Sequence, residues 1–321
     1  MTQTFSHILS LKRGTTKYGA APHKPVLLLA VIKGFEEGLY HSRELEITDE
    51  LLLNFHDVWN ALVKTGHVPN FSLPFFHLKN EKGRFWELIT YPGREIPTTK
   101  SKSIKSFKAL TETVFCARLS DEFYRILMDP VQREELKQAM LQTYFGIKSS
   151  YIPASDYTQN VESQMLYDPE TNYVRKVKRQ IEAQHIDARE EYVVLRSSVF
   201  RKAIIQIYNY QCAITGLKVQ DSNNRPLLEA AHISPFSETY NDSVRNGIAL
   251  SPTFHRAFDK GLVGISDDYR VLLHPQLRDE SREFSLSQYA GKEIFLPENN
   301  AFYPSWQSLQ QHRQRFGIED A

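Results

Sequence analysis

The pattern of apolar and polar positions predicts helices in the first part of the chain. Apolar residues follow one another from Val26 to Ile32 behind Pro25, which is tolerated in the first turn of a helix, so we expect a buried helix there. A second helix is indicated by four apolar residues at helical spacing, Leu51, Phe55, Trp59 and Leu62. Residues 119–146 predict two further helices, because the Asp-Pro pair at 129–130 interrupts an otherwise helical pattern.

Two aromatic segments between these helices have a pattern typical of strands. "FSLPFFHLKN" (71–80) and "RFWELITY" (84–91) are separated only by "EKG", so we expect a β-hairpin. Together with the helices this predicts a mixed α and β domain that ends near Gly146. The chain then becomes polar up to about Ile186, with few bulky apolar residues before Val174, which indicates a linker that could end in a basic helix.

Short helical and strand-like segments alternate in the last part of the chain. We expect a helix over "RSSVFRKAIIQIYNY" (196–210), strands at "CAITG" (212–216) and "PLLEAAHI" (226–233), a short helix over "SPTFHRAFDKG" (251–261) and a strand-like segment at "VGISDDYRVLLH" (263–274). These elements predict the fold class α+β. We expect the chain to consist of a first domain at 1–147, a linker at 148–192 and a second domain at 193–321.

Composition supports two folded domains. A chain of 321 residues is too long for most single cores, and 41% hydrophobic and 12% aromatic residues supply apolar material for two. No apolar run approaches the roughly 20 residues of a membrane helix, and the first residues lack the features of a secretory signal, so we expect a cytoplasmic protein without a membrane partner. Cys116 and Cys212 are the only cysteines, which excludes a disulfide framework and a four-cysteine zinc site.

Charge is unevenly distributed although the formal net charge is only +1. Residues 1–148 contain 20 Lys and Arg against 16 Asp and Glu, a net +4, and the remainder contains 19 against 22, a net −3. The basic excess of the first part is a weak sign of a nucleic-acid partner. Evidence for DNA binding must therefore come from local clusters of basic residues.

Candidate chemistry concentrates in the second domain. His232 ends a predicted strand, Asn246 follows fourteen residues later, and His255 lies nine residues further on the predicted short helix. Asp259 is four residues beyond His255, so both side chains leave the same helix face and could share one divalent cation. Phosphodiester hydrolysis needs a base to activate water, a cation to neutralise the phosphate, and a group that fixes the base. These positions can fill those roles.

The segment "CAITG…LLEAAHISPF…NGIALSPTFHRAFDKG" closely resembles the HNH nucleases with their ββα-metal fold, over roughly residues 200–274. The resemblance implies a divalent metal ion, Mg²⁺ or Mn²⁺. It implies that His232 is the general base, that Asn246 orients the loop carrying it, and that His255 is a metal ligand with Asp259 nearby.

One position departs from the HNH pattern. Many members have Asp or His immediately before the first histidine as a metal ligand, whereas this chain has Ala231. The second protein ligand is therefore open between Asp259 and Glu229, and Glu229 can point toward the site only if its strand bends. Ala231 also supports an alternative in which the chain is a DNA-binding protein with an inactive HNH fold.

Three segments of the first domain carry candidate DNA contacts. They are His23 and Lys24 ahead of the buried helix; Pro74, Phe75 and His77; and Lys100, Lys102 and Lys105, with no acid between them. Each has a structural alternative, because Phe75 also fits a core position and a lysine run also fits a solvated surface.

"APHKPVLLLAV" and "LPFFHLKNEKGRFWEL" resemble, more loosely, the sulfur-binding domain of phosphorothioate-dependent type IV restriction endonucleases, which combine such a domain with a C-terminal HNH module. The resemblance implies double-stranded DNA carrying a phosphorothioate as the partner. It implies that His23 and Lys24 contact the modified strand and that Leu73, Pro74 and His77 line a shallow apolar pocket for sulfur. Leu73 replaces the tyrosine found in relatives, and Lys24 replaces an arginine found in some.

The function that follows is a modification-dependent restriction endonuclease. A nuclease that is targeted instead to a modified base such as methylcytosine is an alternative, although a reader of a flipped base needs a deep aromatic cage. A double-strand break needs two nuclease domains if each cuts one strand, and a homodimer on DNA meets this requirement.

Overall fold

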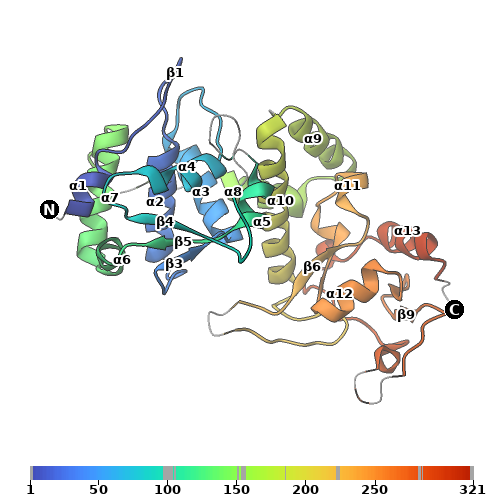
Figure 1. The fold of residues 1–321 in the computed structure, drawn as a ribbon. Helices are drawn as coiled ribbons and strands as arrows, with labels where there is room; N and C mark the ends of the chain where they lie inside the picture. Colours follow the sequence, from blue (N-terminus) through green and yellow to red (C-terminus); the bar gives the residue numbers. More distant parts are fainter. Residues whose placement is uncertain are drawn as a thin grey trace. The chain divides into compact units, whose positions relative to one another are not determined.

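The computed structural model describes residues 3–96, 104, 106–149, 152, 157–184, 186–221, 225–280, 283 and 285–318 (Figure 1). The chain packs as two compact units. Unit 1 comprises Met1–Gln159 and Ala183–Leu195, and unit 2 comprises Asn160–Glu182 and Arg196–Ala321. Helix α10 (Ile186–Ile207) therefore contributes residues to both units. Helices and strands are mixed in an α+β arrangement, and none of the described helices is long and apolar enough to cross a bilayer.

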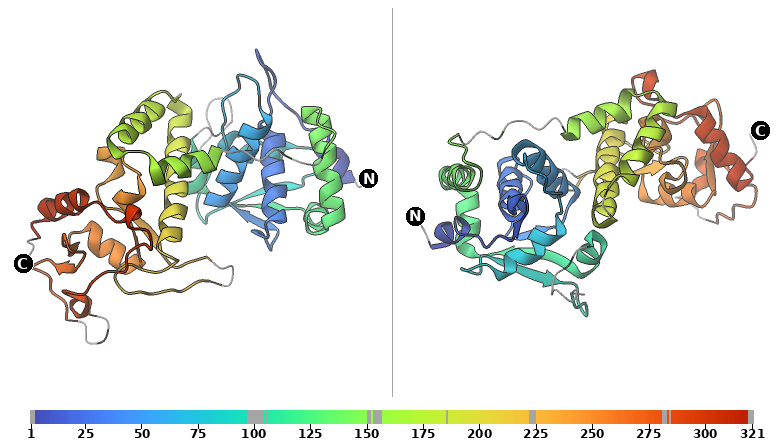
Figure 2. Two further views of the ribbon diagram at one scale, coloured as in Figure 1. Left: turned by 180° about the vertical axis from the view of Figure 1, so that it is seen from behind. Right: turned by 90° about the horizontal axis from the view of Figure 1, so that it is seen from above.

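Unit 1 is built around a buried helix and a small antiparallel sheet. The sheet has the strand order β3 (Glu44–Glu46), β5 (Val114–Leu119), β4 (Trp86–Thr90). Helix α2 (His23–Glu36) is buried along its apolar run, as its pattern predicts, and packs against α3 (Asp49–Leu62). Figure 2 shows these two helices side by side next to the sheet. The other helical elements of unit 1 before its polar segment are α1 (Gln3–Ile8), α4 (Ser72–His77), η1 (Leu78–Asn80), α5 (Phe107–Thr113), α6 (Asp121–Met128) and α7 (Pro130–Phe145).

The hairpin predicted for 71–91 is wrong in its first half. Residues 72–77 form α4, and only β4 is a strand. Phe71 and Phe75 are four residues apart, and their rings stack at 5.4 Å, which is contact across one helical turn. Pro74 lies in the first turn, where a missing N–H costs little, while Asn70 accepts a hydrogen bond from the N–H of Leu73. A run of aromatic residues alone does not separate a buried helix from a buried strand.

The segment predicted as a linker is largely helical. It contains α8 (Tyr157–Tyr167), α9 (Glu170–Glu182) and the beginning of α10. In α9 the buried residues are Tyr173, Val177 and Ile181, which recur every fourth position and form one apolar stripe within a polar sequence. The low apolar content of the segment hides this stripe, which assigns α9 to unit 2.

Unit 2 contains two strands and a helix in the order that the motif predicts. Strand β6 (Glu229–His232) pairs antiparallel with β7 (Gly247–Leu250), and α12 (Pro252–Asp259) packs against β6. The remaining elements are α11 (Phe236–Thr239), η2 (Val244–Asn246), β8 (Val263–Ile265), β9 (Val271–Leu273), η3 (Leu286–Tyr289), η4 (Asn300–Phe302) and α13 (Trp306–Phe316). The strand predicted at 212–216 is instead a tight turn, closed by the N–H of Gly216 bonding to Cys212 and requiring a positive φ at that glycine.

Candidate active site

The β6–β7 register decides which side chains of the motif point inward. Ala231 pairs with Ile248 and is fully buried, whereas His232 pairs with Gly247 and is only half-buried. Successive residues of a strand point to opposite faces, so Ala231 belongs to the core and His232 to the site. A ligand at position 231 is thus replaced here by a packed methyl group.

The imidazole of His232 contacts two aromatic rings. It stacks on Phe200 of α10, with centroids 4.0 Å apart and planes within 6°, and the tilted ring of Phe236 has its centroid 5.8 Å away. Gly247 allows this approach of α10, because a Cβ there would lie 2.7 Å from Phe200 and 2.3 Å from Ile204. Burial lowers the pKa of His232 to about 4, although the charge of Asp242 opposes this shift. The ring is neutral at pH 7.

The Nε2 atom of His232 is buried and has no hydrogen-bond partner among the described residues. Buried polar atoms without partners are uncommon in folded proteins and are frequent at functional sites. Separately, a neutral imidazole can accept a proton, which is the property that a general base requires.

Asn246 connects the segments on either side of the site. Its side-chain amide donates to the carbonyl oxygens of Ser234 (2.9 Å) and Asn241 (2.8 Å), and its Oδ1 accepts from the N–H of Ser234 (2.9 Å). The N–H of Ile233 also donates to the backbone oxygen of Asn246 (2.9 Å). Asn246 is fully buried, so it fixes the turn that follows His232 and does not itself reach a substrate.

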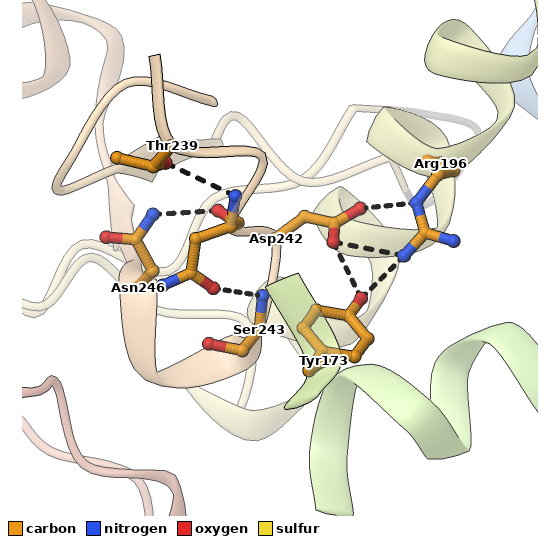
Figure 3. A network of polar contacts seen from close by, with 7 residues as sticks. Tyr173, Arg196, Thr239, Asp242, Ser243 and Asn246 are labelled. Carbon is orange, nitrogen blue, oxygen red and sulfur yellow. Dashed lines mark hydrogen bonds and ion pairs between the residues drawn. The ribbon is translucent and has the colours of Figure 1, made fainter. Parts of the chain in front are cut away.

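A buried ion pair holds the loop that Asn246 contacts (Figure 3). Both carboxylate oxygens of Asp242 accept from the guanidinium of Arg196, at 2.9 and 3.0 Å. The Tyr173 hydroxyl donates to Asp242 at 2.6 Å and accepts from Arg196 at 2.6 Å. Desolvation by burial, and then the charge of Asp242, raise the pKa of Tyr173, so its hydroxyl keeps its proton. These three residues form what we call the buried triad.

Sequence reasoning missed the buried triad. Its members come from α9, α10 and the loop before η2, and Tyr173 lies 69 residues from Asp242. One signal was available: Arg196 directly follows the apolar run at 192–195 and precedes Val199 and Phe200, where a charged residue that becomes buried needs a partner. The sequence offers no indication of which acid that partner is.

The three predicted metal ligands are neighbours, but the two carboxylates lie at different nitrogens of the His255 ring. The Nδ1 of His255 lies 2.6 Å from Glu229, and its Nε2 lies 3.4 Å from Asp259. The ring therefore stands between the two carboxylates. Within the described residues no group of three or more His, Cys, Asp or Glu side chains is arranged to hold a metal ion. The pair formed by His255 Nε2 and Asp259 still offers one nitrogen and one carboxylate to a cation that keeps several waters.

Histidine and lysine at the start of α2 are less free than the sequence suggested. His23 accepts or donates a hydrogen bond at the Val68 carbonyl (2.9 Å) and packs on Trp59 at 4.7 Å, and burial lowers its pKa. The Lys24 ammonium donates to the carbonyl of Lys12 (2.9 Å) and forms an ion pair with Glu81, a buried carboxylate. Lys24 is therefore already neutralised in this conformation.

The candidate sulfur-pocket residues lie on α4, which packs against α2. Leu73 and His77 are half-buried and Pro74 is buried. Burial, and then the nearby charges of Lys24 and Lys79, lower the pKa of His77. The two motif segments meet where α4 packs against α2.

Phe75 is a core residue and not a DNA contact. Its exposed fraction is 0%, its ring meets Trp86 at 5.1 Å, and its carbonyl accepts from the Trp86 indole N–H (3.0 Å). Phe75 and Phe71 occupy the inner face of α4, so an aromatic pair at helical spacing explains this residue without a ligand. Lys100, Lys102 and Lys105 lie outside the described residues.

Comparisons with known proteins agree with this geometry in unit 2. Residues 212–266 match the family model described as HNH endonuclease. The comparison with curated proteins gave no match. Among solved structures, the chain is similar to a modification-dependent TagI restriction endonuclease at 20% identity, with 36% of each chain covered and a TM-score of 0.28. It is also similar to the type IV phosphorothioation-dependent restriction endonuclease ScoMcrA at 11% identity, with 80% of this chain and 94% of that chain covered and a TM-score of 0.32. Residues 212–266 therefore carry the HNH endonuclease domain that the motif indicated.

Proposed function

We propose that the protein is a modification-dependent restriction endonuclease that binds phosphorothioated duplex DNA through unit 1 and hydrolyses nearby phosphodiesters with the HNH site of unit 2. The observation that carries the catalytic part is the neutral, half-buried His232 in the same ββα segment as the His255–Asp259 pair. Its substrate is DNA inside the cell, so the proposed place of action is the cytoplasm.

Hydrolysis assigns one role to each residue. His232 removes a proton from the attacking water as the water oxygen bonds to phosphorus and the bond to the leaving oxygen breaks. Asn246 acts as a positioning residue, because its three side-chain hydrogen bonds hold the turn after His232. The phenyl ring of Phe200 keeps the imidazole in its plane.

His255 Nε2 and Asp259 are the proposed ligands of a divalent cation, Mg²⁺ or Mn²⁺. Such a cation would neutralise the phosphate and stabilise the leaving oxygen. Glu229 accepts the Nδ1 proton of His255 and thereby fixes the tautomer that leaves Nε2 available. This arrangement assigns Glu229 an orienting role and leaves the coordination to the pair on α12.

Charge supports DNA binding by unit 1. Residues 1–35 and 58–80 contain no Asp or Glu, and both stretches contribute to the α2, α3 and α4 packing. His23, Lys24, Leu73, Pro74 and His77 all belong to these two stretches. A protein surface made from acid-free segments suits the phosphate backbone of a duplex.

Recognition of sulfur is proposed for the surface at Leu73 and Pro74. Sulfur in place of a nonbridging oxygen is larger, more polarizable and a poorer hydrogen-bond acceptor, so apolar groups favour it over a hydrated oxygen. The sequence resemblance and the meeting of α2 with α4 support this assignment.

A double-strand break would require two HNH domains, and the proposed active form on DNA is a homodimer.

The test uses two duplexes that are identical except for one phosphorothioate. The parent protein should bind the sulfur-bearing duplex more tightly in a gel shift without metal, and should cut it when Mg²⁺ or Mn²⁺ is added. Equal binding of both duplexes would overturn the sulfur assignment and leave the nuclease, and base-modified duplexes would then be compared. Absence of metal-dependent cutting on any duplex would overturn the catalytic part.

A further inference from the structure

A small hairpin and a neighbouring loop form one surface on unit 1. The hairpin consists of β1 (Thr15–Thr16) and β2 (Gly19–Ala20), all exposed, with Lys17 and Tyr18 at its turn. The loop consists of residues 64–68. We call residues 15–20 and 64–68 together the hairpin surface.

His67 joins the hairpin to the loop. Its Nε2 lies 2.8 Å from the Thr16 hydroxyl, and its Nδ1 lies 2.6 Å from the Thr65 hydroxyl. The Thr16 hydroxyl also accepts from the N–H of Tyr18 (3.1 Å). An isolated two-stranded hairpin is marginally stable, so these hydrogen bonds are what hold this one in place.

Tyr18 is fixed in position and yet remains accessible. Its ring lies against the backbone of Gly66, since a Cβ at that glycine would come within 2.6 Å of the ring, and it meets the His67 ring at 5.6 Å. Nevertheless 45% of Tyr18 is exposed, and the Lys17 ammonium stands 5.0 Å from the ring centroid. An exposed aromatic side chain that is already immobilised loses little conformational entropy when it binds.

The hairpin surface is continuous with the residues proposed to hold the modified strand. The His23 ring lies 6.2 Å from that of His67 and is hydrogen-bonded to the Val68 carbonyl, while 51% of Val68 is exposed. Lys17 and Lys64 add two cations, and the surface lies within the two acid-free stretches. Its charge is therefore complementary to an anionic partner.

We propose that the hairpin surface binds the sugar–phosphate backbone of the same duplex, beside the modified linkage. Lys17 and Lys64 pair with phosphates, and the Tyr18 hydroxyl donates to a phosphate oxygen. The surface contains no Arg, Asn or Gln, the residues that read base edges with paired hydrogen bonds, so it contributes affinity and register without sequence preference. This inference rests on the proposed function, because it requires unit 1 to bind DNA.

The test measures duplex binding by fluorescence anisotropy across a range of salt concentrations, without divalent cation. The parent is compared with Lys17→Ala, Lys64→Ala and Tyr18→Phe on the paired duplexes, with and without one phosphorothioate. Arg125→Ala is the matched control, since it removes one exposed cation on α6 beside Asp121 and Glu122. Thermal unfolding checks that each variant remains folded.

Each lysine variant should reduce the slope of log K against log salt by about 0.9, the value for one lost phosphate contact. Tyr18→Phe keeps the ring and should weaken binding about threefold to tenfold, as expected for one lost hydrogen bond. The ratio of the two duplex affinities should stay at the parent's value. Slopes equal to that of Arg125→Ala, a loss confined to the sulfur-bearing duplex, or tighter binding of the corresponding single strand would each overturn the inference. If the parent binds neither duplex, the proposed function fails first and this inference fails with it.

Discussion

The candidate catalytic region of unit 2 and the candidate DNA-reading region of unit 1 differ in how far apart along the chain their residues lie. His232, Asn246 and His255 fall within 24 residues of one ββα segment, in which β6 pairs with β7 and α12 packs against β6. The reading region draws on α2 and α4, whose candidate residues His23 and His77 lie 54 positions apart. Two of its predicted contacts, Lys24 and Phe75, are occupied by neighbours that the sequence does not identify.

The two regions differ mainly in whether the sequence identifies the residues that contact each candidate side chain. Short spacing within paired strands and one helix fixes the directions of side chains, so convergence can be predicted locally. Whether a side chain is free depends on distant groups: Glu81 for Lys24, Trp86 for Phe75, and Arg196 for Asp242.

The largest expected effect comes from the local motif. His232→Ala should lower the single-turnover cleavage rate about 10²-fold to 10⁴-fold, the usual contribution of a general base, while DNA affinity stays at the parent's value. His274→Ala is the control, because His274 lies in the same unit and its imidazole bonds to the Phe316 carbonyl and the Gln276 N–H. Equal cleavage by His232→Ala and the parent would contradict the catalytic assignment.

The next effect tests the buried triad, whose residues are far apart in the sequence and hold the loop beside the same site. Arg196→Met leaves Asp242 buried without its cation and should lower the free energy of unfolding by about 3–5 kcal/mol. Tyr173→Phe removes one hydroxyl and should cost about 1 kcal/mol. Urea unfolding measures both. If Arg196→Met unfolds at the parent's urea concentration, the buried triad does not support the loop that Asn246 holds.

A pH effect should follow from two buried histidines of unit 2. Burial lowers the pKa of both His232 and His312 to about 4, so the unfolded chain binds protons more readily than the folded one below pH 6.5. Stability should therefore fall as the pH falls from 6.5 toward 4. His312→Phe should flatten this dependence in thermal unfolding at pH 7 and pH 5, whereas an unchanged slope would show that His312 does not contribute.

The smallest effect concerns the reading region. Glu81→Gln should release the Lys24 ammonium for a phosphate and tighten duplex binding about threefold to tenfold. Glu87→Gln on β4 removes the same charge from an exposed position and is the matched control. Equal tightening by the two variants would mean that net charge, and not the Lys24–Glu81 pair, sets the affinity.

Sequence reasoning therefore reached the fold class, the helices with regular apolar spacing, and the ββα segment. It assigned a strand to residues 71–80 because Phe71, Phe75 and Phe76 suit either a buried helix or a buried strand. It missed α8 and anticipated α9 only as a basic helix at the end of the linker, because the few apolar residues of α9, such as Tyr173 and Val177, form a narrow stripe in polar surroundings. The buried triad could not be predicted from the sequence, because Asp242 pairs with residues 46 and 69 positions away and such pairing is decided by tertiary packing.

The measurement that tests the central claim most directly is a competition cleavage assay with the parent protein and Mn²⁺. Two differently labelled duplexes that differ by one phosphorothioate are mixed in equal amounts, and their cleavage rates are measured in the same tube. The account predicts that the sulfur-bearing duplex is cut first, and that His232→Ala cuts neither at a comparable rate. Equal rates for both duplexes, or cutting that survives His232→Ala, would contradict it.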